Sequence, residues 1–134
     1  MNLTTVRDTI ATLVNTACTT NLPTYPVFYE NGPAPDLNQI GEEFLYVSVG
    51  FDSGRQAELG VNPKARYTGH LSLTFMKKAT TGTKSLLQKV DTLTGALKNV
   101  TISDLHLATP TPGRTESHDG WYSQEWAIPF WTHN

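Results

Sequence analysis

Ser117, His118 and Asp119 come closest to a catalytic site, because serine, histidine and aspartate form the triad of many hydrolases. They are consecutive, however, and neighbouring side chains cannot easily form the Ser–His and His–Asp relay around one carbonyl group. The segment also lacks the glycine-flanked serine of a nucleophile elbow. The sequence therefore does not indicate a hydrolase, and a small enzyme that uses the loop from Glu116 to Asp119 is kept only as an alternative.

Metal and cofactor sites are equally poorly supported. The same loop offers Glu116, His118 and Asp119 as ligands, but no second histidine stands four residues away and Cys18 is the only cysteine. The acidic pair Glu42–Glu43 precedes an expected strand, where adjacent side chains point to opposite faces, so it is no carboxylate dyad. Neither common glycine-rich phosphate loop occurs. We expect no enzyme, no metal and no cofactor, and we look for function in surfaces.

The segment 120–131 holds all three tryptophans of the chain. In an extended chain one side of it is mostly apolar and carries Tyr122, Trp126, Ile128 and Phe130. We expect this side to lie in the core. Trp121 and Trp131 fall on the other side, and exposed aromatic residues are typical of protein–protein contacts, which favours an oligomer. The alternative is that other parts of the same monomer cover them.

Apolar residues spaced by three and four predict helices over about 4–19 and 83–98. Short apolar runs and alternating patterns predict strands over 25–29, 43–51, 65–77, 100–107 and 120–131. Loops are expected where proline and glycine cluster, over 30–41, 52–64 and 108–119. The order α-β-β-β-α-β-β predicts an α+β fold with both helices on one face of a single antiparallel or mixed sheet.

Length and composition limit the remaining choices. A chain of 134 residues fits one domain, 1–134. A net charge of −2 argues against a dedicated binder of nucleic acid or anionic membranes. No apolar run near the start is long enough for a signal peptide or a membrane span, and one cysteine cannot form an internal disulfide. An intracellular setting is the expectation.

Two segments in the middle of the chain, Gly54–Gly60 (GRQAELG) and Ala65–Leu71 (ARYTGHL), carry motifs of one family. Together they resemble the R-Q-x-x-L-G and R-Y-x-G-x-L motifs of small tail-terminator-like proteins of tailed bacteriophages and prophages. The ending, with Asp119–Tyr122 (DGWY) and Ile128–Trp131 (IPFW), is similar to the G-W-Y and I-P-F ending of that family. The resemblance covers nearly the whole chain in order, and none of its motifs is catalytic.

This resemblance implies a structural protein of the virion tail, assembled in the host cytoplasm. Such proteins form a ring, commonly a hexamer, that caps the head-proximal end of the tail tube, ends tube polymerisation and offers the surface for head attachment. The implied partners are further copies of the chain, the tail-tube protein and a head-completion or neck protein. DNA would only pass through the lumen, which a mildly negative ring suits, and no membrane is involved. The alternative within this class is another neck or head–tail joining protein.

The candidate contacts with a neighbouring subunit or with the tube come from the motif segments and from the outward side of the last strand. They are Arg55, Gln56, Leu59, Gly60, Arg66, Tyr67, Trp121 and Trp131.

Overall fold

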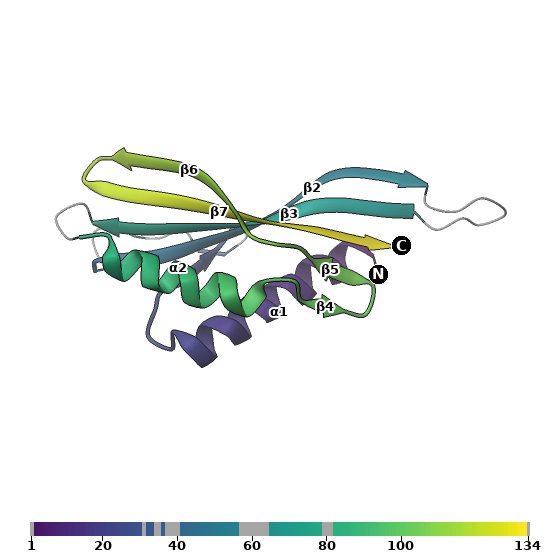
Figure 1. Cartoon of the computed structure of the whole chain (residues 1–134), viewed down its shortest axis with the longest axis horizontal. Coiled ribbons are helices and arrows are strands. Elements are labelled where there is room, and N and C mark those ends of the chain that lie inside the picture. The colour runs from purple at the N-terminus through teal and green to yellow at the C-terminus, as the bar shows by residue number, and fades with distance from the viewer. Residues whose placement is uncertain are drawn as a thin grey trace.

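The computed structural model describes residues 2–30, 32–33, 36, 41–56, 65–78 and 82–133, without the side chains of residues 55 and 56. Within these ranges the chain forms two helices and one mixed, curled sheet (Figure 1). The helices are α1 (Leu3–Asn21) and α2 (Lys84–Leu97). The strands are β1 (Val27–Tyr29), β2 (Glu43–Gln56), β3 (Ala65–Lys78), β4 (Thr101–Ile102), β5 (Leu105–Leu107), β6 (Thr111–His118) and β7 (Trp121–His133).

The strand order is β1-β2-β3-β7-β5-β4, and β6 also pairs with β7. β1 runs parallel to β2, and every other pair is antiparallel. β7 lies along β3 from the Trp121–Lys78 pair to the His133–Arg66 pair. The other edge of β7 is shared, because β6 pairs with its first half and β5 with residues 130 and 131. The predicted α+β class is confirmed.

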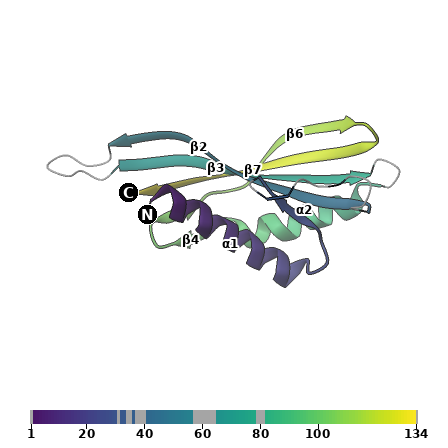
Figure 2. The same ribbon diagram turned by 180° about the vertical axis from the view of Figure 1, so that it is seen from behind.

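Both helices cover the same face of the sheet, as the two opposite views show (Figures 1 and 2). Apolar side chains at the predicted three- and four-residue spacing turn towards the sheet, with Val6, Ile10 and Val14 from α1 and Leu86, Val90, Leu93 and Leu97 from α2 all buried. The sheet supplies alternate residues to this core, including Leu45, Val47, Leu71, Leu73, Phe75, Ile128 and Phe130. In the described part of the chain, no helix is both long and apolar enough to cross a membrane.

Three expectations about local structure were wrong. The segment 108–119 is mostly strand β6 rather than a loop, because Asp119 (φ 50) and Gly120 (φ 80) form a tight turn that joins β6 to β7. Two successive positive φ angles are the hairpin geometry that Asp–Gly favours. The segment 100–107 is two short strands, separated by a turn at Ser103 (φ 53). β2 does not end at Phe51 but continues through an irregularity between Phe51 and Ser53 as far as Gln56.

Cys18 lies on the core-facing side of α1, with 4% of its surface exposed. Burial raises the pKa of its thiol to about 11, from an ordinary value of 9.0. A thiol reagent at about pH 8 should therefore leave the native protein unlabelled and react fully after unfolding in guanidinium, since the thiolate is the reactive form. The folded state keeps this proton to a higher pH than the unfolded state, so the free energy of unfolding should fall as pH rises from 9 towards 11. Fast labelling of the native protein would contradict this burial.

Candidate functional site

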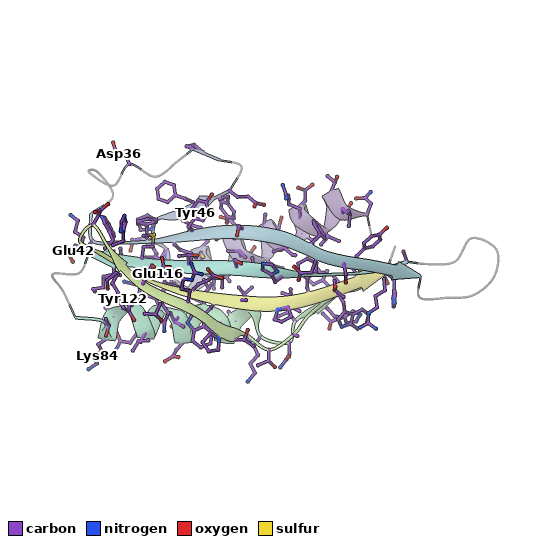
Figure 3. The ribbon with its side chains drawn as sticks, turned by 90° about the horizontal axis from the view of Figure 1, so that it is seen from above. Asp36, Glu42, Tyr46, Lys84, Glu116 and Tyr122 are labelled. Carbon is purple, nitrogen blue, oxygen red and sulfur yellow. The ribbon has the colours of Figure 1, made fainter. Side chains whose placement is uncertain are left out.

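The sheet face that the helices leave uncovered, here called the open face, is the candidate contact surface. Its centre is small and uncharged, with Ser48, Ser72 and Ala127 side by side in the register of β2, β3 and β7. Tyr46, Thr74 and Glu125 form the next row on the same face. Figure 3 looks onto this face, with Tyr46 on β2 and Glu116 on β6. Aromatic side chains lie towards both ends of the open face.

At one end, Trp121 is covered by its own monomer. Its ring meets the ring of Phe44 edge-on with centroids 5.4 Å apart, and Phe44 meets Phe28 in the same way at 5.8 Å. Only 8% of Trp121 is exposed. The predicted exposure of Trp121 is therefore wrong, because the curled sheet brings aromatic residues of β1 and β2 over the start of β7. The alternative, shielding within the monomer, holds for this tryptophan.

At the other end, Trp131 stays half-buried and organises a cluster that we call the Trp131 stack, formed by Arg66, His106, Trp131 and His133. His106 comes from β5, on one side of β7, and stacks on the indole with centroids 3.8 Å apart and planes at 18°. Arg66 comes from β3, on the other side, and its guanidinium carbon lies 4.2 Å from the ring centroid. Such a cation–π contact contributes about 0.5–1 kcal/mol at an exposed site.

The structure thus brings together two predicted contact residues, Arg66 and Trp131. It adds His106, whose Nδ1 lies 3.2 Å from the hydroxyl oxygen of Thr101. The Nε of Arg66 is buried and has no hydrogen-bond partner within the described chain.

Three further predicted contact residues, Arg55, Gln56 and Tyr67, lie on the arm formed by the ends of β2 and β3. Register places Arg55 opposite Arg66 and Gln56 opposite Ala65, while Tyr67 pairs with Gly54. Tyr67 has a packing role, because a Cβ atom added to Gly54 would lie 2.7 Å from its ring. Leu59 and Gly60 lie outside the described residues.

The Glu116–Asp119 segment does not form a catalytic relay. Nε2 of His118 lies 3.0 Å from Oδ2 of Asp119, with both side chains more than four-fifths exposed at the tip of the β6–β7 hairpin. Ser117 precedes His118 on a strand, so their side chains point to opposite faces. Among the described residues no group of three histidine, cysteine, aspartate or glutamate side chains could hold a metal ion. Residues 116–118 form the end of the exposed strand β6, and Asp119 begins the turn to β7.

A buried ionic cluster was missed by the sequence analysis. Glu43 accepts hydrogen bonds from Nζ of Lys77 at 2.7 Å and from the hydroxyl of Ser85 at 3.0 Å, and it also pairs with Lys89. Lys77 is 5% exposed, so this pair lies almost wholly out of water. Burial lowers the pKa of Lys89, whose ammonium also lies 4.9 Å from the ring of Tyr25. The sequence did carry one indication of the cluster, because the alternation of side chains along β3 puts Lys77 on the side that faces the core.

This cluster joins the start of α2 to the sheet. The N-cap residue Thr83 makes no side-chain cap bond, so Ser85 and Lys89 hold the first turns through Glu43 instead. A pocket of ≈ 430 Å³ opens beside the cluster, lined by residues such as Tyr25, Pro26 and Glu42. Because each charge already has a partner, we assign the cluster a structural role.

No family model matches the chain, and no curated protein matches its sequence. Two solved structures are similar to it along nearly the whole length. One, which carries no functional description, has a TM-score of 0.61 at 13% identity and is matched over 91% of this chain and 94% of its own. The other is a chain of the virion of a native gene transfer agent (GTA) particle, with a TM-score of 0.54 at 11% identity, matched over 90% of this chain and 92% of its own. The chain therefore shares its fold with a protein of a GTA virion.

Proposed function

We propose that this chain is a structural protein of a phage-type virion that forms a ring at the head-proximal end of the tail tube. The ring, a hexamer in the resembling family, ends tube polymerisation and offers the surface for head attachment. The observation that carries the proposal is the full-length fold likeness to a component of a GTA virion, a phage-like particle. It agrees with the tail-terminator-like motifs, which were recognised from the sequence independently of the fold.

The placement of the motifs supports an assembly role. The R-Q and R-Y motif residues that the structure describes lie on the β2–β3 arm, and this arm extends beyond the helical layer at one end of the molecule (Figure 1). The G-W-Y motif starts β7 at the other end, where the β6–β7 hairpin rises away from the helices. This position of the motifs at two projecting ends supports contacts with neighbouring molecules.

A ring of this kind acts by capping. One surface binds the last ring of the tube, and the opposite surface does not resemble the tube, so no further tube subunit can add. Closed rotational symmetry multiplies each weak contact, so a single interface can be modest. The small, uncharged centre of the open face and the net charge of −2 suit a channel through which DNA passes without being bound.

The contact role of the Trp131 stack can be tested with purified tail tubes. The intact protein should co-sediment with tubes and appear at one tube end in electron micrographs. Arg66→Ala should weaken this binding roughly tenfold, because it removes the cationic group that lies over the ring of Trp131. Its stability should fall by only about 1 kcal/mol.

Arg7→Ala is the matched control for this variant. Arg7 pairs with Glu30 at 3.2 Å on the helical side, a half-exposed contact of small energy. We expect it to leave tube binding unchanged. Equal binding by Arg66→Ala and the unaltered protein would remove the Trp131 stack from the contact surface, and failure of the unaltered protein to bind tube ends would contradict the proposed function.

A further inference from the structure

The strands β2 and β4 form two opposite edges of the sheet at the same end of the molecule. Pairing across the sheet sets Thr101 of β4 level with Ser53 of β2, through the residues His106, Trp131 and Thr68. At this level β1 no longer covers β2, because it pairs only with residues 45–47. In the described part of the chain, no strand pairs with the outer side of β4. Figure 2 shows both edges towards the end that holds the N-terminus.

The edge of β2 presents backbone groups that have no partner beyond β1. The Val47 carbonyl accepts from the Glu30 amide at 3.0 Å, and the Val49 amide donates to Oε1 of Glu30 at 3.4 Å. Since every second residue of a strand turns its backbone groups to the same side, the Val49 carbonyl and both backbone groups of Phe51 also point outwards. The described residues provide no partner for these three groups. They can therefore pair with another strand.

The edge of β4 presents one residue in the same way. The Leu107 amide of β5 donates to the Val100 carbonyl at 2.8 Å, so Val100 faces β5. The next residue, Thr101, turns its amide and carbonyl away from β5 by the same alternation. Among the described residues neither group has a hydrogen-bond partner. This edge can donate one backbone hydrogen bond and accept another.

The two edges match in direction. Four antiparallel pairings lead from β2 through β3, β7 and β5 to β4, so β4 runs parallel to β2. Rotation about a ring axis near the strand direction keeps this direction and brings edges of similar level together. In a parallel pair, Thr101 opposite Gly50 would donate to the Val49 carbonyl and accept from the Phe51 amide. This register lies two paired residues, about 7 Å, from the level of Ser53, a stagger that a tilt of the strands accommodates.

Exposed apolar side chains lie beside both edges. Among the described residues, three large apolar side chains are more than a third exposed: Leu3, Leu87 and Ile102. Ile102 pairs with the buried Leu105, so its side chain lies on the helical side of β4. Leu3 lies beside the other edge, where a pocket of ≈ 380 Å³ is lined by Leu3, Thr4, Arg7, Asp8 and Phe51. Phe51 packs against the core, so this pocket is also on the helical side.

We propose that β4 of one copy pairs in parallel with residues 49–51 of β2 in the next copy, and that Ile102 enters the pocket beside Leu3 and Phe51. This rests on the proposed ring and names how its subunits are joined. A second copy is the occupant because one chain carries both halves of the contact, on opposite edges, at similar level and on the same side of the sheet. Contact between two different surfaces of like subunits generates a ring when the rotation closes.

Two substitutions test the backbone and the side-chain parts of this joint by the concentration for half-assembly, measured by sedimentation with tail tubes present. Thr101→Pro should raise it roughly tenfold, because each joint loses one of two backbone hydrogen bonds. Thr101→Val keeps the amide and should leave it unchanged. Ile102→Ala should also raise it roughly tenfold through the lost apolar contact. Leu87→Ala, which shortens an exposed leucine of α2, is the matched control and should have no effect.

Cross-linking between single-cysteine variants tests whether unlike surfaces meet. Thr4 is exposed and lines the pocket, so Thr4→Cys and Ile102→Cys should form a covalent dimer when they are co-assembled and treated with a short bis-maleimide. Each variant assembled alone should stay monomeric on a denaturing gel. The native Cys18 can remain, because it is buried and its thiol pKa is raised to about 11. Leu87→Cys in place of Ile102→Cys should give no dimer.

The failure of this joint can be told apart from the failure of the ring. Rings that are visible by electron microscopy, but that tolerate Thr101→Pro and Ile102→Ala and give no mixed dimer, would overturn the joint and leave the ring intact. Dimers from Thr4→Cys alone or from Ile102→Cys alone would also overturn it, because like surfaces would then meet. A chain that never assembles, even with tail tubes, would overturn the proposed function as well.

Discussion

Gly69→Ala should lower the free energy of unfolding by about 3 kcal/mol, a loss at the upper end of the range for overpacked sites. For a domain of this size that corresponds to a fall in Tm of roughly 10 °C. An added Cβ at Gly69 would lie 2.2 Å from the carbonyl oxygen of Gly50 and 2.6 Å from the ring of Phe130. The first atom is backbone of the paired strand, and the second belongs to a ring that is itself packed edge-on against Phe51 at 5.7 Å. Neither can move without disturbing the sheet or the core, so thermal unfolding monitored by circular dichroism should report the full loss.

Gly95→Ala is the control for this substitution. Nothing lies within 4 Å of a Cβ added at Gly95, in the interior of α2. Alanine there should stabilise the protein by about 0.5–1 kcal/mol, since glycine is a poor helix residue. A loss of less than about 1 kcal/mol in Gly69→Ala would show that β2 and Phe130 shift aside, and would contradict the close approach of the two strands.

Glu43→Met should destabilise the protein by about 3–5 kcal/mol in urea unfolding, because it leaves a buried lysine without its partner. Lys77 has 7% of its side chain exposed and depends on Glu43 for a 2.7 Å ion pair. The substitution also removes the oxygen atoms that hold Ser85 and Lys89 at the start of α2. Glu116→Ala is the control, because it removes an exposed charge. It breaks the 3.0 Å ion pair with Arg114 and should change the free energy of unfolding by less than about 1 kcal/mol.

The double variant Glu43→Met/Lys77→Met shows whether the loss of stability comes from the unpaired charge of Lys77 or from altered packing. An apolar pair of similar volume should restore most of the lost stability, since the unpaired buried charge is then gone. Lys89 is 24% exposed at its side chain and can turn towards water. A double variant as unstable as Glu43→Met alone would show that the cost arises from lost packing or from α2, and not from the stranded charge of Lys77.

The helices and the long strands could be predicted from the sequence because each has one buried side. The stripe Val6–Ile10–Val14 and the alternation Leu71–Leu73–Phe75 record that burial directly. β6 leaves no such record, since it is exposed on both sides and its residues follow no apolar period. Only the Asp119–Gly120 turn signalled it, and we interpreted that pair as the end of a loop. The class of the fold was therefore predictable, and the edge strand was not.

The contacts within the candidate site were even harder to predict from local sequence patterns than β6 was. The alternation of side chains along the last strand correctly predicted that Trp121 and Trp131 lie on the open face. It does not predict which other residues cover each indole ring. Phe44, two strands away, covers Trp121, whereas Trp131 is flanked by His106 and Arg66. These neighbours follow from the β3–β7 and β5–β7 registers, which depend on long-range pairing. The contact of Glu43 with Lys77 and Lys89 was hidden for the same reason, because it joins three elements far apart in the chain.

Electron microscopy of virions produced without this protein tests its central role most directly, through the length of the tails. A ring that ends tube growth predicts tails far longer than normal, with no heads attached, and a return to normal length when the protein is supplied again. Tails of normal length that remain unattached to heads would contradict the capping role and identify a head–tail joining protein instead. Normal, headed particles would contradict both.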